Sequence, residues 1–247
     1  MTGLKAAVRA NFDASVDAYE AYERRTGRFG ALARLLVAEM TPRADGPLDV
    51  VLDAGAGTGI STAVFADVGS RTVALDVSHG MLLANDAADR VQGDFDHLPF
   101  PDDTFDGVAF TASLFLVPDP AVAVREARRV CRPGGVVGAV APLGWVDADG
   151  IGVFASLDRE SRSPTGTDDV EAAVTSALDA ETGTWRFATT AGNVERFHAI
   201  PAMATRLYPT DPPAERVRKA TGLLGSLEGT FEERWRWVVG VADGSGC

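Results

Sequence analysis

Cysteine and long apolar runs are nearly absent from this sequence. Among its 247 residues only Cys131 and Cys247 are cysteines, which leaves neither a disulfide framework nor a cysteine-based zinc cluster. No apolar run approaches the roughly 20 residues that a membrane-spanning helix requires, and the first residues lack the apolar core of a secretory signal. The sequence therefore predicts a cytoplasmic protein with no bound metal and no membrane span.

Lysine is also scarce, and the charge balance is strongly acidic. Two lysines and 21 arginines stand against 23 aspartates and 12 glutamates, so the formal net charge is −12. Nucleic acids are bound through clusters of Lys and Arg that contact phosphates, so this balance argues against a nucleic-acid partner and favours a small molecule. A chain rich in Asp and poor in Lys is also typical of proteins that stay hydrated at high salt.

The hydrophobic pattern changes twice along the chain. Apolar positions at three-to-four spacing predict helix over 4–40. Between 48 and 142, short apolar strands alternate with helices, which favours right-handed βαβ units and a buried parallel sheet. We predict one domain over 1–247, made of an N-terminal helical lid (1–47), a core (48–145) and a C-terminal cap that carries the last strands (146–247).

The same patterns give the expected elements. Strands are expected at 48–54, 71–77, 105–112, 136–142, 185–190 and 235–242, with a further short segment at 91–95. Helices are expected at 58–69, 78–89, 120–131, 152–160, 168–181 and 213–227.

The segment from Asp53 to Gly59, DAGAGTG, joins the first parallel strand to a helix. Its glycines allow a sharp turn that brings backbone N–H groups against a ligand. A dinucleotide site would need another glycine near Ile60 or Ser61, where a pyrophosphate meets the helix. Instead Asp53 precedes the loop, and its carboxylate repels phosphate but accepts a hydrogen bond from a cationic amino group. S-adenosylmethionine (SAM) has such a group and no phosphate, whereas a tight turn without any ligand is the simpler alternative.

Two further acids follow the next strands. Asp76 closes the second strand at the spacing where a carboxylate binds a ribose diol. Alternatively, Asp76 or Ser78 only caps the following helix. Asp94 follows the third strand, where its carboxylate can accept from the adenine amino group while Phe95 presents its backbone N–H. An exposed turn also favours this Gly-Asp pair.

These residues resemble the class I SAM-dependent methyltransferases, specifically the type 11 group that includes quinone C-methyltransferases and malonyl carrier-protein O-methyltransferases. The resemblance runs from about Asp49 to Pro142, through VVLDAGAGTG, VALDVS, GDFDHLPFPDDTFDGVAF and ARRVCRPGG. It implies an α/β fold with a Rossmann-like, doubly wound sheet of seven strands in the order 3-2-1-4-5-7-6, the last strand antiparallel. It also implies methyl transfer from SAM to a small-molecule acceptor, with the cap of 146–247 on the acceptor side.

The resemblance also implies roles for individual residues. The family often has His or Gln a few residues after the fourth strand, where this chain has Phe115. Tyr19, in the segment VRANFDASVDAYEAYER, corresponds to an aromatic that covers the cofactor, although Tyr19 and Tyr22 are also at a spacing typical of ordinary packing. The implied cofactor contacts are Asp53, Ala54, Gly55 and Gly57 for the methionine part, Asp76 for the ribose, Val77 and Met81 for the adenine faces, Asp94 and Phe95 for the adenine edge, and Thr111 with Ala112 beside the sulfonium.

The sequence offers no convincing general base. A sulfonium is a good leaving group, so positioning an acceptor accounts for most of the chemistry, and a base is needed only for an acceptor that arrives protonated. Of the three histidines, His97 is expected at the surface, His79 at the surface or in a contact on the cofactor side, and His198 is the candidate base. Trp145, Phe154 and Phe187 are candidates to line an apolar acceptor site, but core packing explains them equally well. The alternatives are a catalytically silent SAM-binding protein with a regulatory or partner-binding role and, less favoured, a nicotinamide dehydrogenase. The oligomeric state and the acceptor atom stay open.

Overall fold

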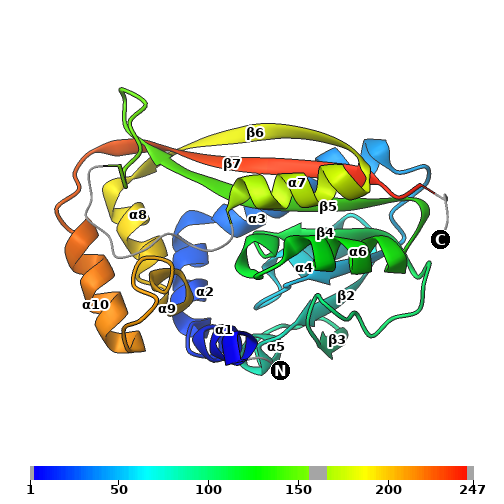
Figure 1. The fold of residues 1–247 in the computed structure, drawn as a ribbon, viewed down its shortest axis with the longest axis horizontal. Helices are drawn as coiled ribbons and strands as arrows, with labels where there is room; N and C mark the ends of the chain where they lie inside the picture. The colour runs from blue at the N-terminus through cyan, green and yellow to red at the C-terminus, as the bar shows by residue number, and fades with distance from the viewer. Residues whose placement is uncertain (1–2, 156–165, 244–247) are drawn as a thin grey trace. The chain divides into compact units, whose positions relative to one another are not determined.

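The computed structural model describes residues 3–155 and 166–243 and contains a seven-stranded sheet with helices around it (Figure 1). The strand order is β3-β2-β1-β4-β5-β7-β6, which confirms the predicted α/β, Rossmann-like order. The strands are β1 (Val50–Ala54), β2 (Arg71–Asp76), β3 (Asp89–Gln92), β4 (Phe105–Thr111), β5 (Cys131–Val146), β6 (Asp179–Thr190) and β7 (Thr230–Val241).

The sheet is mixed, with its last strand antiparallel. β1 pairs in parallel with β2 and β4, and the pairs β2–β3 and β4–β5 are parallel as well. The end of β7 meets the beginning of β5, because Ala242 and Gly135 are joined by a backbone hydrogen bond of 2.8 Å. The end of β6 meets the beginning of β7 through a bond of 3.1 Å from Ala191 to Gly229. β7 therefore runs opposite to both neighbours, as the resemblance implied.

The helices connect these strands. They are α1 (Gly3–Asp13), α2 (Val16–Thr26), α3 (Arg28–Met40), α4 (Ile60–Asp67), α5 (His79–Leu83), α6 (Pro120–Val130), α7 (Thr167–Ala177), α8 (Ala191–His198), α9 (Pro201–Ala204) and α10 (Pro213–Leu224), with short 3-10 helices η1 (Thr41–Arg43) and η2 (Leu114–Leu116). The helix expected over 4–40 is thus three helices. The second break follows from Gly27, which has the left-handed φ of +58° and ends α2.

The chain divides into two compact units. The first, here the sheet unit, comprises Arg28–Ala141, Thr165–Gly183 and Arg236–Cys247. Within it α3 packs on α4 and β4, and α6 packs on α7, which lies beside it in Figure 1. All seven residues of β4 are buried, as expected for a central parallel strand covered on both faces.

The second unit, here the helical unit, comprises Met1–Gly27, Pro142–Pro164 and Thr184–Trp235. Within it α10 packs on α8 and α9, α1 on α9, and α2 on α8. The side chain of Ser15, between α1 and α2, donates to the carbonyl oxygen of Asn11 at 2.6 Å and accepts from the N–H of Ala202 at 3.0 Å. This hydroxyl joins the N-terminal helices to α9.

Several expected boundaries were wrong. The helix expected at 78–89 ends at Leu83, and Cys131 begins β5 instead of ending a helix. β5 also includes the expected turn at 132–135, which lies in an irregularity of its pairing with β4, because Phe105 pairs with Cys131 and Gly107 pairs with Val136. In the helix expected at 152–160, residues 152–155 form a bridge and a turn, and 156–160 lie outside the described residues. β6 begins at Asp179, inside the helix expected at 168–181, and α8 and α9 were not predicted.

Candidate functional site

The glycine-rich loop between β1 and α4 is held by the neighbouring strand. The backbone N–H groups of Gly55 and Ala56 both donate to the carbonyl oxygen of Leu75, at 2.7 and 3.0 Å. Gly55 has φ +83°, and a Cβ there would lie 2.4 Å from the Cβ of Ser113. Gly57 has φ +53°, and nothing lies within 4 Å of where its Cβ would be. Both positions therefore favour glycine, and the loop faces open space at Gly57.

Asp53 is a fully buried carboxylate near the end of β1. Its Oδ2 accepts hydrogen bonds from the hydroxyls of Ser61 and Thr62, both at 2.7 Å, in the first turn of α4. Its Oδ1 has no hydrogen-bond partner among the residues that the structure describes. Burial raises the pKa of Asp53 to about 6; the two hydroxyls lower it, and the charge of Asp76 raises it. A buried oxygen without a partner costs stability, and the charge of this carboxylate attracts a cationic group at the nearby loop.

Asp76, the last residue of β2, braces the glycine loop. Its Oδ2 accepts the backbone N–H of Gly57 at 2.9 Å, and its Oδ1 accepts that of Ser78 at 2.8 Å. The cap of α5 is Ser78, whose hydroxyl accepts the N–H of Met81 at 3.1 Å. A carboxylate has about four lone-pair sites, and bracing the loop uses one on each oxygen of Asp76. Val77 is half-buried and Met81 is buried.

The turn after β3 brings an aromatic ring to the loop. Asp94 is half-buried, and its Oδ1 accepts the N–H of Asp96 at 2.8 Å, so the carboxylate shapes its own turn. The ring of Phe95 packs edge-on against Phe110, with centroids 5.2 Å apart. It also lies 3.2 Å from the position of a Cβ on Gly55. The structure thus brings Phe95 together with the glycine loop.

The end of β4 is tied to the end of β1. The hydroxyl of Ser113 donates to the carbonyl oxygen of Ala54 at 2.6 Å. Thr111 is 6% exposed, and its hydroxyl oxygen has no partner within the described part of the chain. Ala112 has φ +58°, a conformation that non-glycine residues rarely adopt and that is often found at functional sites. Phe115, in η2, is buried, so the position where the family often has His or Gln presents an apolar side chain.

Sequence reasoning missed two polar residues at the loop. Thr58 lies between Gly57 and Gly59, and its buried hydroxyl oxygen has no partner in the described ranges. Asn85 is 1% exposed and donates from Nδ2 to the carbonyl oxygen of Gly57 at 3.3 Å. Thr58 stands inside the motif and was visible there. Asn85 was placed within an expected helix, so nothing in the local pattern indicated it.

The sheet unit therefore collects most of the predicted cofactor residues at the carboxyl ends of β1, β2, β3 and β4. Three buried oxygens there lack partners among residues 3–155 and 166–243: Oδ1 of Asp53, Oγ1 of Thr58 and Oγ1 of Thr111. The carboxylate oxygen can accept from a cationic group, and the two hydroxyls can donate or accept. This combination suits the zwitterionic methionine part of SAM, and none of the three groups is a cation that would bind a phosphate.

Two predicted residues lie in the helical unit instead. Tyr19 is half-buried on α2, and Tyr22 is buried with its ring edge-on to Phe197 at 5.5 Å. His198, at the end of α8, is 5% exposed, and its Nδ1 lies 2.8 Å from the carbonyl oxygen of Val194. Three rings surround the imidazole at centroid distances of 4.9 to 5.1 Å: Trp145, Phe154 and Phe197. Of the expected apolar acceptor residues, Trp145 and Phe154 thus belong to one aromatic cluster.

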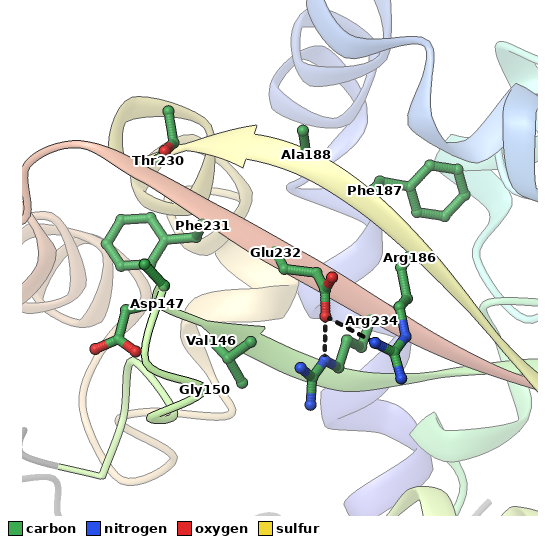
Figure 2. A pocket seen from close by; sticks show the side chains of 11 residues that line it. Val146, Asp147, Gly150, Arg186, Phe187, Ala188, Thr230, Phe231, Glu232 and Arg234 are labelled. Carbon is green, nitrogen blue, oxygen red and sulfur yellow. Dashed lines mark hydrogen bonds and ion pairs between the residues drawn. The ribbon is translucent and has the colours of Figure 1, made fainter.

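Phe187 lines a separate pocket of about 400 Å³ in the helical unit (Figure 2). Figure 2 shows Glu232 between two arginines, with Arg234 at 2.5 Å and Arg186 at 3.8 Å from the same carboxylate oxygen. The charges of the pocket wall are therefore largely compensated. No predicted cofactor residue is among those that line it, which are Val146, Asp147, Ala148, Gly150, Arg186, Phe187, Ala188, Thr230, Phe231, Glu232 and Arg234.

Within residues 3–155 and 166–243, no helix has the length and apolar character needed to cross a membrane. The same residues contain no group of three His, Cys, Asp or Glu side chains arranged to hold a metal ion.

Residues 52–138 match the family model described as a methyltransferase domain. The chain is 48% identical over 92 residues to the demethylmenaquinone methyltransferase of Mycobacterium marinum, and 47% identical over 91 residues to that of Mycolicibacterium vanbaalenii. Each match covers 36% of this chain and 40% of the relative, so the chain spans about two fifths of the length of these relatives.

Solved structures resemble the fold over most of its length. The YcgJ protein of Bacillus subtilis superposes with a TM-score of 0.59 at 18% identity, over 87% of this chain and 99% of that one. A putative methyltransferase from Bacillus halodurans gives a TM-score of 0.56 at 18% identity, over 84% of this chain and 98% of that one. At these identities the likeness concerns the fold.

Proposed function

We propose that this chain is a class I methyltransferase that transfers a methyl group from SAM to a small-molecule acceptor, a proposal supported by the match of residues 52–138 to a methyltransferase domain and by the fold. The observation that carries the proposal is the unpartnered Oδ1 of Asp53, buried at the carboxyl end of β1 beside a loop that faces open space. A carboxylate oxygen in that position attracts a cationic amino group and repels phosphate, which favours SAM over a dinucleotide.

In this proposal, residues at the ends of different strands bind different parts of the cofactor. Asp53 accepts from the ammonium of the methionine part, with Ala54, Gly55 and Gly57 forming the loop beneath it. Asp76 accepts from the ribose hydroxyls while it braces the loop. The remaining contacts are Val77 and Met81 at the faces of the adenine, Asp94 and Phe95 at its edge, and Thr111 near the sulfur. A contact from Tyr19 stays a prediction from the sequence.

SAM, when bound, supplies an activated methyl group, so the chain's own residues need only bind, orient and exclude water. The buried ends of β1 and β4 and the ring of Phe95 provide a dry, fixed surface for that purpose. His198 is held by Val194 and enclosed by three rings, which supports a packing role over that of a general base. An acceptor that reacts without losing a proton first, or that ionises readily, suits such a site.

We infer further that the acceptor is a quinone-type small molecule. The support is the identity of 48% to a protein named demethylmenaquinone methyltransferase, although that match covers 36% of this chain. Demethylmenaquinone in its reduced form is therefore the first acceptor to test. The absence of a nucleic-acid partner and the cytoplasmic location stay predictions from the sequence.

The test has a binding step and a turnover step. Calorimetric titration should give a Kd in the micromolar range for SAM and no heat for NAD. Incubation with SAM and reduced demethylmenaquinone should then yield S-adenosylhomocysteine at a rate that depends on the acceptor. Absence of SAM binding would refute the proposal as a whole. Binding without turnover on any small acceptor would favour the catalytically silent alternative.

A further inference from the structure

Residues 93–103 form most of the connection between β3 and β4, and they include Asp94 and Phe95. Their own regular structure is limited to an isolated bridge between Asp94 and His97, with turns and bends around it. A connection of this kind keeps one conformation where a more rigid element holds it. The positions of Asp94 and Phe95 therefore depend on the bonds that this connection makes to neighbouring elements.

Two charged side chains of α6, Glu126 and Arg129, bind the backbone of the β3–β4 connection. Nη2 of Arg129 donates to the carbonyl oxygen of Leu98 at 3.0 Å, and Nη1 donates to that of Phe100 at 2.9 Å. The N–H of Leu98 donates to Oε2 of Glu126 at 2.9 Å. Three backbone groups of an irregular segment are thus bound by one pair of side chains on a regular helix.

The pair is itself rigid. Nε and Nη2 of Arg129 donate to the two carboxylate oxygens of Glu126 at 2.9 and 2.8 Å, which is the bidentate geometry of a strong ion pair. The hydrogen bond from Arg129 holds the pKa of Glu126 below its usual range, so the pair stays ionised at neutral pH. Nη1 of Arg129 also donates to Asp102 at 2.8 Å. Arg129 therefore makes five hydrogen bonds, as many as a guanidinium has N–H donors.

The bound part of the connection lies close to the part that carries the predicted adenine contacts. Leu98 is 3% exposed, and the ring of Phe100 packs edge-on against Phe105 with centroids 5.0 Å apart. Phe95 lies three residues before Leu98, and its ring lies 3.2 Å from the position of a Cβ on Gly55. Three residues span at most about 11 Å. Fixing the backbone of Leu98 therefore also limits where Phe95 can lie.

We propose that Arg129, together with Glu126, is a positioning residue for recognition of the adenine. It holds the β3–β4 connection so that the carboxylate of Asp94 and the backbone N–H of Phe95 meet the adenine edge, and it does not contact the cofactor itself. The inference rests on the proposed function, to which it adds that selectivity for the base depends on two side chains of α6.

The ratio of two dissociation constants tests this role. S-adenosylhomocysteine has the adenine amino group, and S-inosylhomocysteine has a carbonyl oxygen in its place. Wild type should bind the first at least about tenfold more tightly, because the second places an acceptor opposite Asp94. Arg129→Lys keeps the charge but lacks the planar fork that binds Glu126 and both carbonyls, so the ratio should fall below about threefold. Glu126→Gln keeps an acceptor for the N–H of Leu98 and should lower the ratio by a smaller factor.

A double-variant cycle distinguishes positioning from general destabilisation. Asp94→Asn should lower the ratio by itself, because an amide can bind either base. If Arg129 acts through Asp94, adding Arg129→Lys to Asp94→Asn should change the ratio less than about twofold. Arg128→Lys is the matched control, since Arg128 is the preceding residue of α6 and pairs with Asp243 at 2.8 Å. That variant should keep the wild-type ratio, and thermal unfolding without ligand shows that each variant is folded at the temperature of the titrations.

Three results would overturn the inference while leaving methyl transfer from SAM intact. The first is a loss of affinity for both ligands by the same factor in Arg129→Lys, which indicates a purely structural role. The second is an equal fall in the ratio whether or not Asp94 is present. The third is a wild-type ratio near one, which leaves no selectivity for Arg129 to support. If wild type binds neither SAM nor S-adenosylhomocysteine, the proposed function fails first and this inference fails with it.

Discussion

Asp53 and His198 are both buried titratable side chains, one in each unit, and their surroundings differ in kind. Asp53 is fully buried at a strand end, and one of its two carboxylate oxygens has no partner in the described ranges. His198 is buried at a helix end, hydrogen-bonded to the carbonyl oxygen of Val194 and packed against three aromatic rings. The carboxylate in the sheet unit therefore has an unsatisfied oxygen, whereas the imidazole in the helical unit has a hydrogen bond and is packed among rings.

This contrast separates a binding role from a packing role. A folded protein gains nothing from an unpartnered buried carboxylate, so its retention points to a ligand that is present during function. A buried imidazole with a hydrogen bond and close ring contacts is already stable without any ligand. Substitutions at the two positions should therefore change different quantities: SAM affinity at Asp53 and folding stability at His198.

The largest effect is expected from Asp53→Asn. The amide oxygen can still accept from Ser61 and Thr62, but the charge that attracts the SAM ammonium is lost, so SAM affinity should fall about a hundredfold. Since the variant also removes a buried charge, its Tm without ligand should be unchanged or higher above about pH 6. Calorimetric titration and thermal unfolding measure the two quantities.

Asp106→Asn is the matched control for that experiment. Asp106 is also buried, near the start of β4, but it accepts the N–H of Val50 at 2.8 Å and pairs with Arg132. Its substitution should lower stability and leave SAM affinity within about twofold. If Asp53→Asn likewise lowers stability and leaves SAM affinity unchanged, Asp53 is a structural carboxylate and does not bind the ligand.

The pH dependence of SAM affinity tests the same role of Asp53, with an expected effect of about tenfold. Burial raises the pKa of Asp53 to about 6, and only the ionised form attracts the ammonium. SAM affinity should therefore increase about tenfold between about pH 5 and 7 in wild type and stay flat in Asp53→Asn. Stability without ligand should move the other way, because the folded state binds this proton more tightly than the unfolded chain. That contribution is present below the ordinary pKa of Asp and is lost as pH rises through about 6.

One result would contradict the predicted pH dependence of SAM affinity. A wild-type affinity that does not change across this range, with the ligand's own ionisation accounted for, would mean that Asp53 does not contact the ammonium. The same result in a protein whose stability does respond to pH would confine the role of Asp53 to folding.

The strand ends were more predictable than the segments between them. Asp53, Asp76 and Thr111 were placed correctly at the ends of their strands because alternating apolar segments determine where parallel strands stop. The early end of α5, at Leu83, was not predicted, because Asn85 is held outside the helix by a bond to Gly57 that spans 28 residues, which no local pattern reveals.

The second half of the chain was less predictable for the same reason. β6 extends over Asp179–Thr190, well beyond the expected 185–190, and begins with polar residues that do not alternate as a strand pattern requires. Its pairing with β7 in the sheet outweighs the weak local preference. The aromatic cluster likewise joins Trp145 to His198 across a long stretch of sequence, so the sequence left Trp145 undecided between packing and acceptor binding.

The smallest effect on catalysis is expected at His198, where the comparison predicts a loss of stability instead. His198→Asn keeps a donor near the position of Nδ1 and removes the rest of the ring that Trp145, Phe154 and Phe197 contact. The free energy of unfolding should fall by about 1–3 kcal/mol because those ring contacts are lost, while kcat changes less than about threefold. A general base would show the reverse, since its removal typically lowers kcat by about 10²–10⁴-fold. Denaturant unfolding and initial rates with a saturating acceptor distinguish these results. A large drop in kcat at unchanged stability would mean that His198 is catalytic. The contrast drawn here between Asp53 and His198 would then be wrong.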